Sequence, residues 1–300
     1  MRISVLTATY NRAHTLPNLY KSLIKNKKHC NQFEWLIMDD GSTDNTKKLV
    51  ESWIKEKIID IKYFKQSNQG KMMALNNLLD KISGEITVEC DSDDYLTDNC
   101  FKDILNKWDT IKDDDSVYGL AFLKMTPDKK IIGNKFALED GKVRRVFDMY
   151  FKDGVTGDKC FVFKSNIRKQ FKHKLEGNEK FATEGRMYHE MDLKYSGLKC
   201  FNNPVLICEY LDDGYTKNIL KLFKQNPLTH YYYYLEMFKF DMHEIPFKKR
   251  LHIIKHYILF SCLTNQKKIN VTRNAEGLFN KILVFILIIP GYLKTKAKFK

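Results

Sequence analysis

The stretch ITVECDSDDYLTDN, residues 86–99, places a β-branched run directly before a cluster of acidic residues. Asp91, Asp93 and Asp94 lie within four consecutive positions there. Carboxylates this close together repel one another, so the cluster is costly unless a cation, a hydroxyl-rich ligand or solvent offsets its charge. The β-branched run predicts a buried strand. The groups that lie against the end of that strand decide which chemistry the protein can carry out.

The residues around this stretch alternate between strand and helix patterns over the first hundred positions. Such alternation is typical of a parallel sheet with right-handed crossovers. We predict helices at residues 15–27, 44–57 and 71–82, and strands at residues 3–10, 33–41, 59–66 and 84–91. Asp44 is expected to cap the second helix. Ligands bind beyond the carboxyl ends of strands in such sheets, so the residues that follow each strand should converge on one edge.

Those strand ends carry side chains suited to ligand binding. They are Thr9, Tyr10, Asn11 and Arg12 after the first strand, Asp39 and Asp40 after the second, and Asp91 to Asp94 after the last. Two carboxylates separated by one residue at a strand end can share a hard divalent cation such as Mg²⁺ or Mn²⁺. The alternative interpretation is a solvated acidic turn that only begins the next helix.

The remainder of the chain predicts a mixed extension of the sheet and then a helical region. Strand patterns at residues 117–125 and 160–164 are separated by turns, and the pattern becomes helical and basic after residue 215. We therefore predict an α/β catalytic domain at residues 1–215 and a helical, basic carboxy-terminal region at residues 216–300.

The net charge of +14 is concentrated near the end of the chain. Residues 221–300 hold 15 Lys or Arg residues and 4 Asp or Glu residues. The apolar run at residues 282–289, followed by Pro290 and four lysines, is shorter than the roughly 20 residues that span a bilayer. It predicts a helix in the interface of an anionic membrane, on the cytoplasmic face. A buried helix with a solvated lysine tail is the alternative.

The cysteine pattern and the absence of several motifs narrow the class of protein further. The seven cysteines show no CxxC or zinc-like spacing, so we expect no disulfide framework, no structural metal site and a reducing cytoplasm. The amino-terminal strand pattern lacks the apolar core of a signal peptide, which predicts that the bulk of the protein is not secreted. Phosphate-loop, dinucleotide-binding, nucleophile-elbow and HExxH motifs are missing from the sequence.

Four segments together resemble the family 2 glycosyltransferases with the GT-A fold, in the branch that builds bacterial polysaccharides and cell-surface glycans. They follow the family's order and spacing, as SVLTATYNR, EWLIMDDGSTDNT, NQGKMMALN and ECDSDDYL. A weaker similarity continues through EKFATEGRMYHEMD and EYLDDGYTKNI. The resemblance implies an α/β nucleotide-binding fold with a mainly parallel, mixed sheet flanked by helices.

By that resemblance, the donor is a nucleotide-diphosphate sugar, most often a UDP-sugar. Tyr10 would stack on the base, and Asp40 or its neighbour Asp39 would hydrogen-bond the base edge. Asp91 would reach the ribose or the sugar, and Asp93 would bind a metal ion, Mn²⁺ or Mg²⁺. The full set expected at the nucleotide sugar is Thr9, Tyr10, Arg12, Asp39, Asp40, Lys71, Asp91 and Ser92.

Two basic residues, Arg12 and Lys71, are available to offset the charge of the diphosphate. Many family members carry an arginine where this chain has Leu75. That contact is therefore not expected here, and Lys71 is expected to replace part of it.

A general base is expected in the acidic segment at residues 176–192. An inverting transferase needs a carboxylate that removes the proton of the acceptor hydroxyl. We choose Glu184, because KFATE resembles the family's short apolar stretch that ends in an acid. The family's usual acidic pair is missing, which leaves Glu179, Glu190 and Asp192 as alternatives.

These features predict a metal-dependent, inverting transferase that moves a sugar from a nucleotide donor to a lipid-linked or cell-surface glycan. An anionic membrane surface is the expected further partner, and nucleic acid is not. Two other functions stay open. One is a nucleotidyltransferase, against which the missing glycine-rich basic loop counts. The other is a non-catalytic, membrane-docked glycan-binding scaffold, which gains nothing from three repelling carboxylates.

Overall fold

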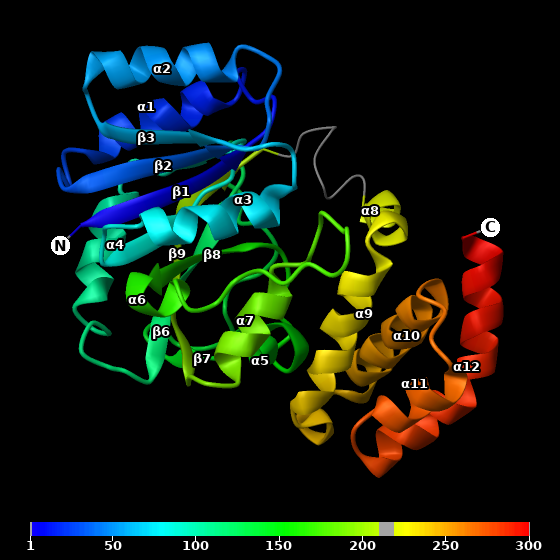
Figure 1. Cartoon of the computed structure of the whole chain (residues 1–300). Helices are drawn as coiled ribbons and strands as arrows, with labels where there is room; N and C mark the ends of the chain where they lie inside the picture. The colour runs from blue at the N-terminus through cyan, green and yellow to red at the C-terminus, as the bar shows by residue number, and fades with distance from the viewer. Residues whose placement is uncertain (1, 210–218, 300) are drawn as a thin grey trace. The chain divides into compact units, whose positions relative to one another are not determined.

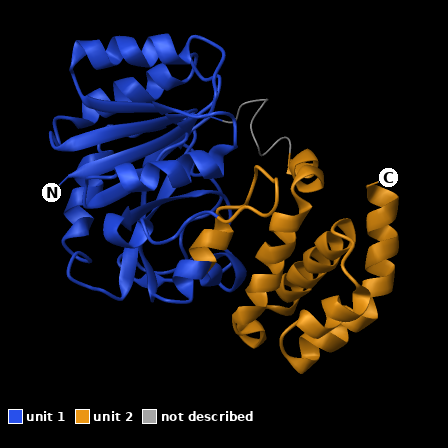
Figure 2. Ribbon diagram, viewed as in Figure 1, with its two compact units in different colours: residues 1–173, 190–211 blue, residues 174–189, 212–300 orange. Residues whose placement is uncertain are grey.

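The computed structural model describes residues 2–209 and 219–299 (Figure 1). The chain divides into two compact units, which Figure 2 shows in different colours. The first unit contains residues 1–173 and 190–211, and the second contains residues 174–189 and 212–300. The predicted domain boundary at residue 215 lies outside the described residues, so that division stays a prediction.

The first unit is built on a mixed sheet that has nine strands among the described residues. The strands are β1 (Ile3–Thr9), β2 (Phe33–Asp39), β3 (Asp60–Lys65), β4 (Ile86–Glu89), β5 (Asp94–Leu96), β6 (Val117–Met125), β7 (Val143–Arg144), β8 (Lys159–Lys164) and β9 (Gly197–Cys208). Their order is β3-β2-β1-β4-β8-β6-β9-β5, and β7 pairs with β9. Strands β3, β2, β1 and β4 are parallel, whereas β8 runs antiparallel to β4 and β6. The predicted α/β class with a mainly parallel, mixed sheet is confirmed.

Helices flank this sheet on both faces (Figure 1). They are α1 (Leu16–Asn26), α2 (Thr46–Glu56), α3 (Lys71–Leu78), η1 (Leu79–Lys81), α4 (Cys100–Trp108), α5 (Val146–Phe151) and α6 (Ser165–Arg168). The strands and helices predicted for the first hundred residues are all present. Asp44 accepts a hydrogen bond from Thr46 N at 3.0 Å, although Asn45 is the residue directly before α2.

Side chains of β2 alternate between two apolar layers, because successive residues of a strand point to opposite faces. Trp35 packs with the stacked rings of Tyr20 from α1 and Trp53 from α2. Leu36 belongs to the layer on the other face, together with Leu75 of α3. The strand is buried throughout, as expected of a central parallel strand.

Three strands, β5, β7 and β9, are not predicted from the sequence, and β7 has only two residues. β5 has only three residues and begins inside the acidic cluster, so no alternation of apolar residues marks it. β9 contains the run from Asn202 to Pro204, which breaks its pattern and coincides with register shifts against β6. Pairing with neighbouring strands, rather than local sequence preference, forms all three strands.

The second unit is helical. It contains α8 (Ile219–Gln225), α9 (Pro227–Glu236), η2 (Met237–Lys239), η3 (Met242–Glu244), α10 (Phe247–Leu263), α11 (Lys268–Asn274) and α12 (Leu278–Lys298), and α7 (Gly185–Asp192) has residues in both units. α10 packs against α9 and α12, and Tyr257 of α10 stacks on Tyr231 of α9. The predicted helical character of the carboxy-terminal region is confirmed for residues 219–299.

One helix in the described part of the chain, α12, is long and apolar enough to cross a membrane, judged by length and composition only. It has 21 residues, and 22% of its most apolar window is buried within the protein. The run at residues 282–289 is only the middle of this helix. The short length of the run therefore does not exclude that the helix as a whole crosses a bilayer.

All seven cysteines are free and buried. Six of them lie in the first unit, and Cys262 lies on α10.

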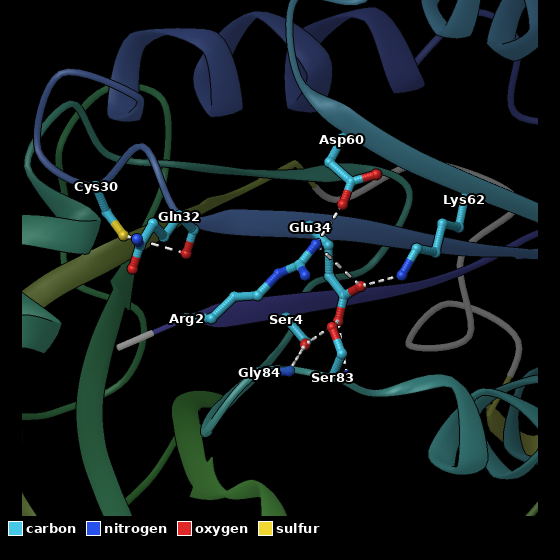
Figure 3. Close-up of polar contacts among 9 residues, drawn as sticks. All are labelled: Arg2, Ser4, Cys30, Gln32, Glu34, Asp60, Lys62, Ser83 and Gly84. Atoms are coloured by element: carbon cyan, nitrogen blue, oxygen red, sulfur yellow. Dashed lines mark hydrogen bonds and ion pairs between the residues drawn. The ribbon is translucent and has the colours of Figure 1, made fainter.

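The buried carboxylate of Glu34 ties three strands together near their amino-terminal ends (Figure 3). It accepts hydrogen bonds from Ser4 Oγ of β1 at 2.5 Å, and from Ser83 N and Oγ at 2.8 and 2.7 Å. Lys62 Nζ of β3 lies 2.7 Å from Oε2 of Glu34, and Arg2 NH2 lies 3.5 Å from the same oxygen. Burial opposes ionisation of Glu34, but these hydrogen-bond donors, of which Lys62 has the largest effect, lower its pKa to about 2.

We expect Glu34→Gln to destabilise the protein by about 2–3 kcal/mol at neutral pH, because Lys62 and Arg2 lose their buried counter-charge. The folded-state pKa is depressed below the ordinary value of 4.5. The stabilisation is therefore present above pH 4.5 and is lost as the pH falls toward about 2. Urea unfolding, followed by circular dichroism from pH 7 to pH 3, measures this difference.

The control is Glu51→Gln, which removes an exposed carboxylate paired with Lys47 on α2. It should change the free energy of unfolding by less than about 0.5 kcal/mol. A Glu34→Gln difference that stays constant from pH 7 to pH 3 would contradict the prediction.

Candidate functional site

The loops that follow β1 and β2 are joined by hydrogen bonds around Asn11. Its backbone N donates to Ser42 Oγ at 2.9 Å, and its Oδ1 accepts from Thr43 N at 2.8 Å. Asn11 adopts a left-handed φ of 52°, which asparagine tolerates better than most residues. Asp40 N donates to Thr9 O at 2.8 Å. The residues after these two strands therefore lie together at one edge of the sheet.

Two carboxylates, Asp39 and Asp40, hold the loops at this edge. Asp39 is fully buried and accepts hydrogen bonds from Ser42 N at 2.6 Å and from the Tyr63 hydroxyl. Asp40 accepts three hydrogen bonds, at 2.7–2.8 Å, from the loop at residues 66–70 that leads into α3. A carboxylate has about four acceptor positions, so Asp39 and Asp40 could each accept a further hydrogen bond. That a nucleobase donates this bond stays a prediction.

Three candidate binding residues lie at or just after the end of β1. Thr9 is buried, and its Oγ1 has no hydrogen-bond partner among the described residues. Tyr10 is 46% exposed, and an exposed aromatic side chain is suited to stacking on a planar ligand. Arg12 is half-buried, and its backbone N donates to Thr46 Oγ1 at 3.2 Å. The edge of the sheet thus offers an aromatic surface beside a cation.

The three carboxylates of the acidic cluster lie in three different settings. Lys71, the first residue of α3, pairs with Asp91 at 2.6 Å. Asp94, the first residue of β5, is buried and pairs with Lys124 of β6 at 3.2 Å. Burial raises the pKa of Asp93, and the charge of Asp91 raises it further. Burial also raises the pKa of Asp94, although its pairing with Lys124 opposes the shift, so Asp93 and Asp94 both bear the electrostatic cost of the cluster.

The loop between β4 and β5 is fixed by further contacts. Ser92 is buried, and its carbonyl accepts a hydrogen bond from Thr15 Oγ1 at 2.8 Å. Cys208 Sγ of β9 donates to Asp94 Oδ2 at 2.9 Å. These contacts position Asp93 without using its carboxylate.

The cluster suits a cation that a ligand helps to hold. Within residues 2–209 and 219–299, no group of three or more His, Cys, Asp or Glu side chains is arranged to hold a metal ion. Mg²⁺ and Mn²⁺, however, are often bound by one or two carboxylates together with substrate phosphates. A divalent cation near Asp93 would offset both causes of its raised pKa. The residues present fit a metal ion shared with a diphosphate.

Sequence reasoning missed two buried cations near this edge. Lys124 reaches Asp94 from 30 positions along the chain, and Arg168 donates to Glu89 Oε1 at 2.6 Å from 79 positions away. No local pattern marks either residue, because only the folding of the sheet brings the partners together. Leu75, where the family often has arginine, is 2% exposed and packs in the apolar layer beneath α3.

Two of the four candidate bases cap helices. Glu179 accepts hydrogen bonds from the first free N–H groups of α9, both at 2.7 Å. Asp192 accepts from the first N–H groups of α5 at 2.8 and 3.1 Å and from the Tyr118 hydroxyl at 2.8 Å. Burial raises the pKa of Asp192 to about 7, but only 3% of the residue is exposed. These contacts favour a structural role for both carboxylates.

The other two candidates, Glu184 and Glu190, are half-buried. Glu184 Oε2 accepts a hydrogen bond from the Tyr188 hydroxyl at 3.3 Å. Glu184 belongs to the second unit and Glu190 to the first. The role of Glu184 as a base stays a prediction, with Glu190 as its alternative. Most of the segment EYLDDGYTKNI lies outside the described residues.

The segment at residues 174–189 is held by α9 within the second unit. Arg186, which is 5% exposed, donates to both carboxylate oxygens of Glu236 at 2.9 and 3.0 Å and to Glu176 at 2.8 Å. Asn226 Oδ1, directly before α9, accepts from two backbone N–H groups of the segment at 2.9 and 3.0 Å. The helical region thus supports the segment that carries Glu184.

The model of the family Glycosyl transferase family 2 matches residues 4–173. The poly(ribitol-phosphate) beta-N-acetylglucosaminyltransferase TarS of Staphylococcus aureus is 31% identical over 103 residues, which are 34% of this chain and 18% of that protein. The GalNAc(5)-diNAcBac-PP-undecaprenol beta-1,3-glucosyltransferase of Campylobacter jejuni is 28% identical over 183 residues, which are 59% of this chain and 57% of that protein. The chain therefore matches less than two thirds of the length of these relatives.

Solved structures share the fold. Residues 1–349 of Staphylococcus aureus TarS, in complex with UDP-GlcNAc, match with a TM-score of 0.62 and 15% identity, over 100% of this chain and 91% of that chain. The mannosyltransferase PcManGT of Pyrobaculum calidifontis, in complex with GDP-Man and Mn²⁺, matches with a TM-score of 0.56 and 15% identity. The match covers 99% of this chain and 86% of that chain. The GT-A fold that the sequence resemblance implied is confirmed.

We expect Arg186→Met to destabilise the second unit by about 3 kcal/mol or more, because it leaves Glu176 and Glu236 without their buried partner. Thermal unfolding followed by circular dichroism measures the loss. Arg273→Met, which removes an exposed arginine of α11, is the matched control and should shift stability by less than about 0.5 kcal/mol. Equal melting temperatures for the two variants would contradict the structural role of Arg186.

Proposed function

Since this chain belongs to glycosyl transferase family 2, we propose that it transfers a sugar from a UDP-sugar to a hydroxyl group of a lipid-linked or cell-surface glycan. Membership of this family argues against the two other functions that the sequence leaves open, a nucleotidyltransferase and a non-catalytic scaffold. The observation that carries the proposal is one edge of a sheet, where Tyr10, Asp40 and Asp93 follow three parallel strands. Lys71 pairs with Asp91 at the same cluster.

The donor nucleotide is proposed to stack on the exposed ring of Tyr10. Asp40, or Asp39, would accept the imide N–H of uracil, and Asp91 would accept a hydrogen bond from a hydroxyl of the ribose or the sugar. Arg12 and Lys71 would oppose the charge of the diphosphate, and Thr9 and Ser92 would lie at the same edge of the sheet beside the donor. The TarS complex with UDP-GlcNAc, which shares the fold, supports a uridine donor.

A divalent cation, Mn²⁺ or Mg²⁺, is proposed to be held by Asp93 together with the diphosphate oxygens. The raised pKa of Asp93, caused by burial and by Asp91, supports this choice. When bound, such a cation neutralises charge that develops on the leaving diphosphate. The fold neighbour in complex with GDP-Man and Mn²⁺ is consistent with this chemistry.

The transfer is proposed to be a single displacement with inversion. The acceptor oxygen forms a bond to the anomeric carbon while the bond from that carbon to the β-phosphate oxygen breaks. UDP leaves with the electron pair, and the proton of the acceptor hydroxyl passes to a carboxylate on the acceptor side. Glu184 is our first choice for this carboxylate, and Glu190 is the alternative, because Glu179 and Asp192 cap helices.

The acceptor class is proposed from the names of the relatives. One acts on poly(ribitol-phosphate) and the other on an undecaprenol-linked glycan. A lipid-linked acceptor places the reaction on a membrane surface. We propose that the enzyme works in the cytoplasm at the inner face of the cell membrane, where a soluble UDP-sugar and a lipid-linked acceptor are both available.

We expect Asp93→Ala to lower transfer by more than about 10²-fold, beyond the usual cost of disturbing the outer shell of a metal site. The variant should also lose the Mn²⁺-dependent part of UDP affinity while keeping its melting temperature, because it removes one of several repelling carboxylates. Titration calorimetry with UDP, with and without Mn²⁺, and slow hydrolysis of a panel of UDP-sugars measure these effects.

Asp113→Ala, which removes an exposed carboxylate after α4, serves as the control and should leave both quantities unchanged. Full activity in EDTA, or in the Asp93→Ala variant, would remove the metal from the proposal. Absence of UDP binding by the intact chain would remove the proposed donor.

For the base, Glu184→Gln is expected to keep UDP affinity and to lose transfer by about 10²- to 10⁴-fold, the usual contribution of a positioned general base. Glu190→Gln is the matched variant, because the two residues lie six positions apart and are both half-buried. Activity loss in Glu190→Gln together with normal activity in Glu184→Gln would transfer the role to Glu190.

A further inference from the structure

We infer that the outer face of α12 is a docking surface for an anionic lipid bilayer, and that this helix lies in the plane of the membrane interface. The inference deepens the membrane location in the proposed function and rests on it only for the cellular setting. Its evidence comes entirely from the second unit.

The outer face of α12 is a continuous apolar stripe. Its large apolar side chains there are 42–76% exposed. They are Leu278, Phe279, Ile282, Phe285, Ile286, Ile289 and Leu293. Steps of three and four residues separate most of them, so they share one side of the helix. Exposed apolar side chains gathered in this way mark an interaction surface, whereas isolated ones do not.

The opposite face of α12 is already used for packing. Asn280, Val284 and Ile288 are buried at intervals of four residues. Arg250 Nε of α10 donates to Asn280 Oδ1 at 2.8 Å. A Cβ atom at Gly291 would lie 2.6 Å from a side-chain carbon of α10, so the two helices approach closely there. One face of the helix, polar and apolar in equal parts, therefore packs into the core of its unit, and the apolar stripe lies on the other face.

The positions of the lysines favour an in-plane helix over a crossing one. Lys281 and Lys294 bracket the apolar residues 282–293. The helix as a whole is long enough to cross a membrane, but its stretch without charge has 12 residues and makes about 18 Å at 1.5 Å per residue, so crossing a hydrocarbon core of roughly 30 Å would carry charged lysines into it. Crossing would also remove the packed face from α10. In the plane, by contrast, the stripe can enter the acyl region while the lysines reach the headgroups.

The charge of α12 favours lipid over a second copy of the chain. The helix carries four lysines and no acidic residue between Leu278 and Lys298. Two copies packed through their stripes would bring lysines together without a carboxylate to pair with them. An anionic leaflet supplies the missing counter-charge along the whole length of the helix.

The test uses the intact chain and vesicles of phosphatidylcholine, with and without phosphatidylglycerol. We expect sedimentation with the anionic vesicles only, weakened by high salt. The combined variant Phe285→Ser, Ile286→Ser and Ile289→Ser should lose at least about tenfold in partitioning, because it removes the centre of the stripe. The control is Ile54→Ser with Ile58→Ser, which removes exposed apolar side chains of the first unit and should bind as the intact chain does.

Orientation is tested with two tryptophan reporters, Phe285→Trp and Leu293→Trp. The three native tryptophans are buried in the first unit, so they supply a constant background. Quenching by lipids brominated at a shallow or a deep acyl position reports the depth of each reporter. An in-plane helix places both reporters at the same shallow depth. A deep reporter at position 285 with a shallow one at 293 would overturn the in-plane orientation in favour of a crossing helix.

Three other outcomes would overturn the lipid surface itself. They are no binding to anionic vesicles at low salt, equal binding by the serine variant, and self-association in ultracentrifugation that the serine variant abolishes. UDP binding, measured in the same samples, separates the two proposals. A chain that binds UDP but not vesicles disproves the docking surface alone, and a chain that binds vesicles but not UDP disproves the donor alone.

Discussion

Repulsion among carboxylates at the end of one strand is the constraint around which the first unit is arranged. α3 and β6 each bring a lysine to the cluster, Lys71 to Asp91 and Lys124 to Asp94. The position of β6 in the mixed half of the sheet is therefore part of the site, although it follows the cluster by more than twenty residues. Although two of the carboxylates are paired with lysines, the pKa values of Asp93 and Asp94 are both raised, and a cation shared with a diphosphate would offset the charge at Asp93.

The sequence predicts those features of the fold and the site that depend on short-range patterns of residues. Alternating strands and helices, the strand-end side chains and the four motif segments all lie within the first hundred residues, and they lead to the fold and the family. The structure adds what depends on distant partners. Lys124, Arg168 and Arg186 have no local signature, because each meets its carboxylate only after folding. β5 is too short for any periodicity to show.

The candidate bases illustrate the same limit. Four of the carboxylates at residues 176–192 are candidates for the base, with Glu184 preferred only by resemblance, and two of the other three accept hydrogen bonds at helix starts. Which N–H groups a carboxylate meets depends on where α5 and α9 begin in space. The helical region also has a second role that its composition does not reveal. α9 holds the segment that carries Glu184, in the same unit whose outer helix exposes the apolar stripe.

The burial of the cysteines has a chemical consequence. Burial raises the pKa of Cys90, Cys100 and Cys160, so almost none of these thiols is ionised at neutral pH. The thiolate is the form that oxidants and alkylating reagents attack. The interior of the first unit should therefore resist oxidation whatever the surroundings. A cysteine introduced on the surface would react with a maleimide dye long before these three buried thiols do.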